Sequence, residues 1–100
     1  MKDELAKLIQ MAIELLTDCG WKEKAKWFSE LKNAIKNSHL GSNELNECLT
    51  ELDNVLSGMG SFSDLPLSDK TGKMSEREVK SLQWELVERL GSAIEELRKG

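Results

Sequence analysis

The sequence Ser-Gly-Met-Gly-Ser-Phe-Ser-Asp-Leu-Pro occupies positions 57–66, where the helical periodicity of the chain stops. Two glycines flank a methionine, and the stretch ends at Pro66, the single proline of the chain. Glycine and proline both disfavour the interior of a helix. The stretch therefore predicts the start of a long loop, residues 57–74, that separates three helices from a fourth.

On both sides of this loop, apolar residues recur at steps of three and four, which places them on one face of an α-helix. The pattern predicts helices over about Asp3–Cys19, Trp21–Asn37, Asn43–Leu56 and Glu76–Arg98. Gly20 is expected to end the first helix and Ser42 or Asn43 to cap the third. Ser75 and Glu78 have the spacing of a capping box. Because no strand pattern occurs, we expect an all-α fold, a single-domain four-helix bundle over residues 1–100.

Within the long loop we assign structural roles to Gly58, Met59, Gly60, Ser61, Phe62 and Leu65. Gly58 is expected to end the third helix, and Ser61 with Asp64 to cap a short turn. Met59, Phe62 and Leu65 would plug the end of the bundle. The alternative is that the backbone N–H groups of residues 58–61 bind an anion. The absence of Lys and Arg between positions 38 and 69 favours the structural role.

The fourth helix contains one interruption, Gly91, which costs about 1 kcal/mol relative to alanine in a helix. A glycine there predicts that a neighbouring backbone packs closely or that the helix bends.

Several apolar residues extend the stripes of the first and fourth helices, so that a lone bundle would leave them uncovered: Met11, Ile13, Trp84 and Ile94.

Composition excludes several classes of function. With 39% apolar and 32% charged residues, the chain is expected to fold around one core. A net charge of -4 disfavours a nucleic-acid binder and docking on anionic lipid. The sequence shows neither a signal peptide nor a transmembrane run, so we expect a cytoplasmic protein with reduced cysteines.

Few residues offer catalytic chemistry. His39 is the single histidine and has no metal-binding partner nearby in sequence, while Cys19 and Cys48 occupy core positions of their helices. The third helix carries several glutamates but no Glu-x-x-His motif of the kind that di-metal bundles use. We therefore expect no enzyme activity, no metal and no cofactor.

Charge is distributed unevenly along the chain. Residues 38–69 carry a charge of -6 with no compensating cation, whereas residues 21–37 carry +3. The acidic residues are Glu44, Glu47, Glu51, Asp53, Asp64 and Asp69. Such a surface repels itself but attracts a basic partner and speeds its association. The alternative is an acidic face that serves solubility alone. The Lys-rich second helix is interpreted as a solvated face, and the alternative is a basic patch for nucleic acid or an acidic partner.

The residues of positions 58–65 resemble the signature of a family of small bacterial helical domains of unknown function. Its members carry Gly-Gly-Met-Gly-Ser, then an aromatic or aliphatic residue, Asn or Ser, and Asp-Leu. Trp21 and Trp27 match tryptophans in the second helix of members, whereas Ser57 replaces the first glycine. Members often lie beside polymorphic toxin genes, so the resemblance implies an immunity protein that binds and neutralises a toxin domain.

These observations together predict an immunity protein that occludes the active site of a cognate toxin domain, a basic nuclease. The expected contact residues are Glu44, Glu47, Glu51, Asp53 and Asp64, with Trp84 as an aromatic anchor if it is exposed. The alternative is a helical adaptor or homodimerisation module with no toxin partner.

Overall fold

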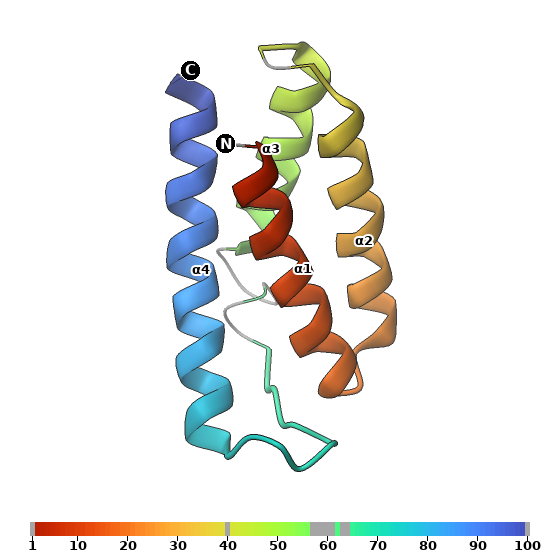
Figure 1. Ribbon diagram of the computed structural model, residues 1–100, viewed down its shortest axis with the longest axis vertical. Helices are drawn as coiled ribbons and strands as arrows, with labels where there is room; N and C mark the ends of the chain where they lie inside the picture. The colour runs from red at the N-terminus through yellow and green to blue at the C-terminus, as the bar shows by residue number, and fades with distance from the viewer. Residues whose placement is uncertain (1, 40, 57–61, 63–64, 100) are drawn as a thin grey trace.

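The structure, a computed structural model, describes residues 2–39, 41–56, 62 and 65–99. It contains four helices: α1 (Lys2–Asp18), α2 (Lys22–Asn37), α3 (Asn43–Leu56) and α4 (Glu76–Lys99). The helices alternate in direction along an elongated bundle of 40 × 23 × 20 Å (Figure 1). The predicted all-α four-helix bundle is confirmed, and the four helices lie within two residues of their predicted bounds.

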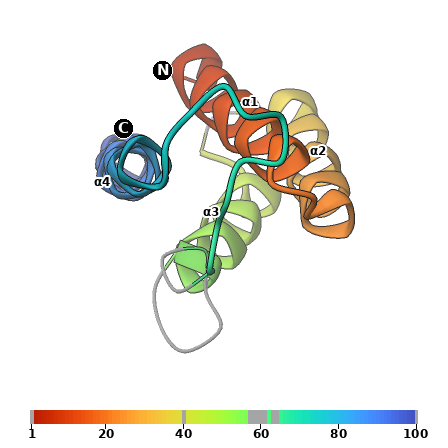
Figure 2. The ribbon, with the colours of Figure 1, turned by 90° about the horizontal axis from the view of Figure 1, so that it is seen from below.

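The helices pack in the order of the chain. α1 packs against α2 and α4, and α3 packs against the same two helices from the other side. Viewed along the bundle, α4 stands at the edge and has only α1 and α3 as helical neighbours (Figure 2). The outer side of α4 is therefore open to solvent over much of its length.

Local signals in the sequence set the ends of the helices. Gly20 has a φ of +87°, and the N–H of Trp21 donates to the carbonyl of Leu16 over 2.8 Å, which ends α1 in a Schellman motif. At α4, the N–H of Ser75 donates to the Glu78 carboxylate and the N–H of Glu78 donates to the Ser75 hydroxyl. The expected glycine stop and capping box are both confirmed.

The apolar stripes of all four helices meet in one core. Fully buried leucines and isoleucines dominate it, among them Leu5, Ile9, Leu16, Ile35, Leu45, Leu49, Leu52, Leu86 and Leu90. Ile94 belongs to this core, so the expectation that a lone bundle leaves it uncovered is wrong. Ile13 is half-buried, whereas Met11 and Trp84 are exposed as expected.

The long connection between α3 and α4 contributes to the core. Phe62 is buried and meets Phe28 edge to face, with the ring centroids 5.7 Å apart. Leu65 is half-buried against the core. The predicted plug is thus confirmed at Phe62 and Leu65, while the roles expected for Gly58, Met59, Gly60, Ser61 and Asp64 fall outside the described residues.

A buried side chain of α4 fixes the connection. The amide nitrogen of Gln83 donates to the carbonyl oxygens of Phe62, over 2.7 Å, and of Leu65, over 3.1 Å. Further along, the backbone N–H of Lys70 donates to the carbonyl of Asp18 over 2.8 Å, which ties the connection to the end of α1. The connection therefore closes the lower end of the bundle.

We expect Gln83→Leu to lower the free energy of unfolding by about 2 kcal/mol, because it removes the two hydrogen bonds from α4 to the carbonyl groups of Phe62 and Leu65. Urea unfolding followed by circular dichroism measures the change. Gln10→Leu is the matched control, because the Gln10 side chain accepts from Lys32 at a partly exposed place. Equal losses in the two variants would contradict the assigned role of Gln83.

Candidate functional site

The acidic surface predicted from the sequence lies on α3. The Ser42 hydroxyl accepts from the backbone N–H of Leu45 over 3.1 Å and so caps the helix, as expected. Leu45, Leu49, Leu52 and Leu56 anchor one face of α3 in the core. This face fixes the rotation of the helix and turns Glu44, Glu47 and Glu51 to solvent. We call these three glutamates the acidic ridge.

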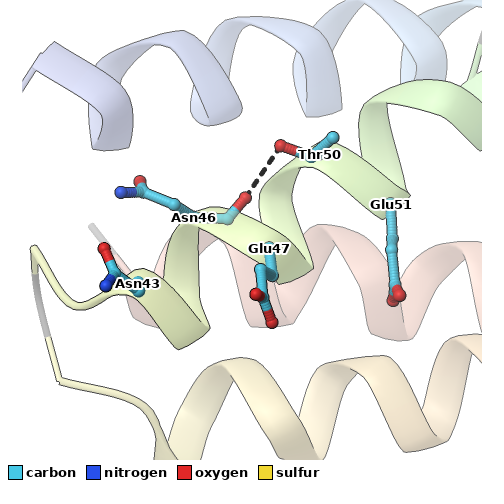
Figure 3. A pocket seen from close by; sticks show the side chains of 5 residues that line it. All are labelled: Asn43, Asn46, Glu47, Thr50 and Glu51. Atoms are coloured by element: carbon cyan, nitrogen blue, oxygen red, sulfur yellow. Dashed lines mark hydrogen bonds between the residues drawn. The ribbon is translucent and has the colours of Figure 1, made fainter.

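The ridge borders a shallow open groove on α3. Glu47 and Glu51 line it together with Asn43, Asn46 and Thr50, and the two glutamates extend to the same side of the helix (Figure 3). The Thr50 hydroxyl donates to the Asn46 carbonyl over 2.9 Å. Among the side chains that the structure describes, no cation forms an ion pair with Glu44, Glu47 or Glu51. The ridge therefore presents three charges without local compensation.

Asp53 departs from the expectation drawn from the sequence. Its carboxylate lies 3.7 Å from the guanidinium of Arg98, which also donates to the Thr50 hydroxyl over 3.3 Å. The expectation that no cation compensates this stretch is therefore wrong at Asp53, because α4 brings Arg98 to α3 from far along the chain. The pair is half-exposed and contributes little to stability, but it reduces the negative charge at this end of the ridge.

The remaining carboxylates of the stretch are not part of the ridge. Asp64 lies outside the described residues. Asp69 accepts hydrogen bonds from the N–H and hydroxyl of Thr71 and from the N–H of Met74, at 2.6–2.9 Å. These bonds, those from Thr71 above all, lower the pKa of Asp69. Asp69 thus shapes the turn before α4.

Trp84 is exposed, as its predicted role requires, with 60% of its surface accessible. It lines a groove between residues 65–68 and the first half of α4. That groove shares no residue with the one on α3. The structure therefore does not bring Trp84 into the groove beside the acidic ridge, and its role as an anchor for the same partner stays a prediction.

The two cysteines and the single histidine differ in their exposure. Cys19 is buried, Cys48 is half-buried, and both are free thiols. Burial raises the pKa of both thiols, and nearby carboxylates raise it further. For Cys48 these carboxylates belong to Glu51, Glu47 and Glu44. His39 is exposed. Within the described part of the chain, no group of three or more His, Cys, Asp or Glu residues is placed to hold a metal ion.

The sequence did not predict the roles of Gln83, which binds the connection before α4, and of Arg98, which pairs with Asp53. Gln83 occupies a position of the buried stripe of α4, and a polar residue there is the signal that could have revealed it. Arg98 offered no comparable signal, because its pairing depends on how α3 and α4 align.

In the described residues, the structure contains no helix long and apolar enough to cross a membrane.

Comparisons with protein-family models, with curated proteins and with solved structures gave no match to this chain.

Cys48 offers an internal reporter of the ridge. We expect Glu44→Gln/Glu47→Gln/Glu51→Gln to speed alkylation of Cys48 by the uncharged reagent iodoacetamide, because removing the carboxylates lowers the thiol pKa and raises the thiolate fraction. Mass spectrometry measures the rate at each cysteine. Cys19, which is buried elsewhere, is the internal control. Equal acceleration at both cysteines would indicate loosening of the fold and contradict the electrostatic cause.

Proposed function

We propose that the chain is an immunity protein, which binds a cognate bacterial toxin domain and neutralises it in the cytoplasm. The observation that carries the proposal is the acidic ridge: Glu44, Glu47 and Glu51 are exposed, adjacent and without an ion-pair partner among the described residues. The resemblance of residues 58–65 to a family that lies beside toxin genes points in the same direction.

The chemistry of the ridge suggests a basic partner. Three carboxylates on successive turns of one helix form an array of negative charges along about 10 Å, from a rise of 1.5 Å per residue. An enzyme that cleaves nucleic acid must present a basic surface to the phosphates of its substrate. A rigid row of carboxylates can occupy that surface and exclude the substrate. Occlusion of a nuclease active site is therefore the mechanism that we propose.

The fold supports such a role because the ridge is rigidly held. The four leucines of α3 are at most 4% exposed, and Ser42 caps the helix, so the three carboxylates are fixed relative to one another before binding. A surface that is already ordered loses little conformational entropy on association. The polar groups of Asn43, Asn46 and Thr50 border the ridge and offer hydrogen bonds at its rim.

The alternative, a helical adaptor or homodimerisation module with no toxin partner, is favoured by one observation, the exposure of Trp84 and Met11. These two residues lie on different helices, however, and the groove that Trp84 lines does not include Met11. The acidic ridge therefore remains the better basis for a function.

A survival experiment tests neutralisation. The C-terminal domain encoded by the gene immediately upstream is expressed in bacteria with and without this chain. We expect cells to survive only when the chain is present, because occlusion of the toxin prevents damage. Colony counts measure the effect. Equal survival of cells that lack the chain would contradict an immunity function for it.

A kinetic experiment tests the role of the ridge. We expect Glu44→Gln/Glu47→Gln/Glu51→Gln to slow association with that toxin domain by about tenfold at low salt, because electrostatic attraction accelerates encounter. We also expect the association rate of the unaltered chain to fall as salt rises. Surface plasmon resonance measures both effects.

The matched control is Glu4→Gln/Glu14→Gln/Glu96→Gln, which changes the net charge equally but on α1 and α4, where all three residues are exposed. We expect this control to slow association far less. An equal effect of the two triple variants would show that net charge alone matters, and it would contradict a specific role of the ridge even if neutralisation holds.

A further inference from the structure

Two features of α4 lack a role in the single chain. Trp84 exposes 60% of its surface, although burying an indole side chain is strongly favourable. Gly91 lies in the helix interior, where alanine would be more stable by about 1 kcal/mol. The two residues are seven positions apart, or two helical turns, and so lie on the same side of α4.

Gly91 lines a hollow between α3 and α4. The hollow is also lined by Val87, Ile94, Asp53 and Arg98. A Cβ atom built on Gly91 would meet no atom within 4 Å, so no part of the described chain fills this space. The expectation that a neighbouring backbone packs closely against Gly91 is therefore wrong within the described chain. The hollow has room for a side chain from another molecule.

The charges along this side of α4 change sign at Trp84. Arg77 and Lys80 precede it, and Glu88, Glu95 and Arg98 follow it, and all five are exposed. Apart from Arg98, which pairs with Asp53, this face is basic in its first half and acidic in its second, and such a face is complementary to itself when two copies run antiparallel. This pattern, together with the open side of α4 (Figure 2), identifies a second copy of the chain as the matching partner.

We propose that two copies of the chain associate through α4, antiparallel, about a two-fold axis that passes between Val87 and Glu88. In this register Trp84 sits in the hollow over Gly91 of the partner subunit, and Lys80 lies opposite Glu95 of the partner subunit. When two identical helices pair antiparallel about a two-fold axis, each residue lies opposite the partner residue whose number adds with its own to a fixed value. The residue numbers of Trp84 and Gly91 add to the same value as those of Lys80 and Glu95, so one register satisfies both contacts.

The remaining charges are compatible with this register. Arg77 faces Arg98 of the partner subunit, and the charge of Arg98 is already offset by Asp53. Glu88 lies near its own symmetry mate, so the register leaves Glu88 and Arg77 without a counter-ion. A glycine at the contact lets two helix axes approach closely, which favours burial of the indole. The contact is nevertheless small, so the dimer should be weak and depend on concentration.

This contact leaves the acidic ridge accessible. The groove beside the ridge is lined by Asn43, Asn46, Glu47, Thr50 and Glu51, and none of these residues lines the hollow over Gly91. The dimer would therefore present two ridges at once. The proposal places Trp84 at the dimer contact instead of at the contact with a toxin, and it stands independently of the partner that the ridge binds.

Sedimentation equilibrium over about 10 µM to about 1 mM tests the association, since this range spans the affinities of small interfaces. We expect the mass to rise from the 11.3 kDa of one chain toward twice that value. Trp84→Ala should weaken dimerisation by about tenfold or more, because tryptophan is among the side chains that dominate interfaces. Met11→Ala, at the other exposed large apolar residue, should leave it unchanged.

A second variant separates the contact from the fold. Gly91→Gln fills the hollow with a good helix former, so we expect it to raise the melting temperature of the chain while it weakens dimerisation about tenfold or more. A merely structural role of Gly91 would not produce opposite changes in these two measurements.

Charge reversal tests the register. Lys80→Glu and Glu95→Lys should each weaken the dimer, whereas the double variant Lys80→Glu/Glu95→Lys should restore it, because the two charges exchange across the axis. Glu88→Gln should strengthen it. A chain that stays monomeric over the whole concentration range would overturn the proposal. So would a dimer that tolerates Trp84→Ala and Gly91→Gln, or single charge reversals that the double variant fails to rescue.

Discussion

The bundle depends on how the long connection between α3 and α4 is closed, and the two hydrogen bonds from Gln83 accomplish this. A connection that passes through the core must bury backbone carbonyl groups, and each one costs free energy unless a donor reaches it. Gln83 donates two hydrogen bonds from one amide group, to the carbonyls of Phe62 and Leu65, which also accept from backbone N–H groups of the connection. The same contact places Phe62 against Phe28 and so joins the connection to α2.

Apolar contacts and a helix cap hold the acidic helix in place. The ridge carboxylates repel one another, and α3 packs less extensively against α2 and α4 than α1 does. The leucine face of α3 and the Ser42 cap hold the helix in place. Arg98 then offsets one charge at the α4 side. The ridge is therefore a strongly charged surface on a helix whose position is fixed by apolar contacts.

The sequence was sufficient for features that are encoded locally. The Schellman motif at Gly20 and the capping box of Ser75 and Glu78 involve residues within five positions of each other, and the apolar stripes follow from helical periodicity. The acidic ridge was also predictable, because its spacing on α3 fixes its common face. These elements could be derived without knowing how the helices pack.

Features that depend on packing could not be derived. The Asp53–Arg98 pair joins residues on two helices, and the register between those helices is set by side chains of the whole core. Ile94 was expected to be uncovered because its stripe is broad, yet it lies in the core that the four helices form together. Trp84 was grouped with the ridge because both lacked core positions, whereas the structure gives them separate grooves. Sequence periodicity predicts on which face of its own helix a residue lies, but it does not predict which other helix packs against that face.

The two departures from ideal helix design on α4 have a common explanation. Local preference would place alanine at position 91 and a polar residue at position 84, because the space over Gly91 is open and Trp84 is 60% exposed. Natural sequences depart from such preferences mainly where function requires it. A protruding indole and an empty hollow, two turns apart on one helix face, complement each other in shape only across two molecules. Trp84 does not belong to the core of the single chain, so the contact serves assembly and not folding.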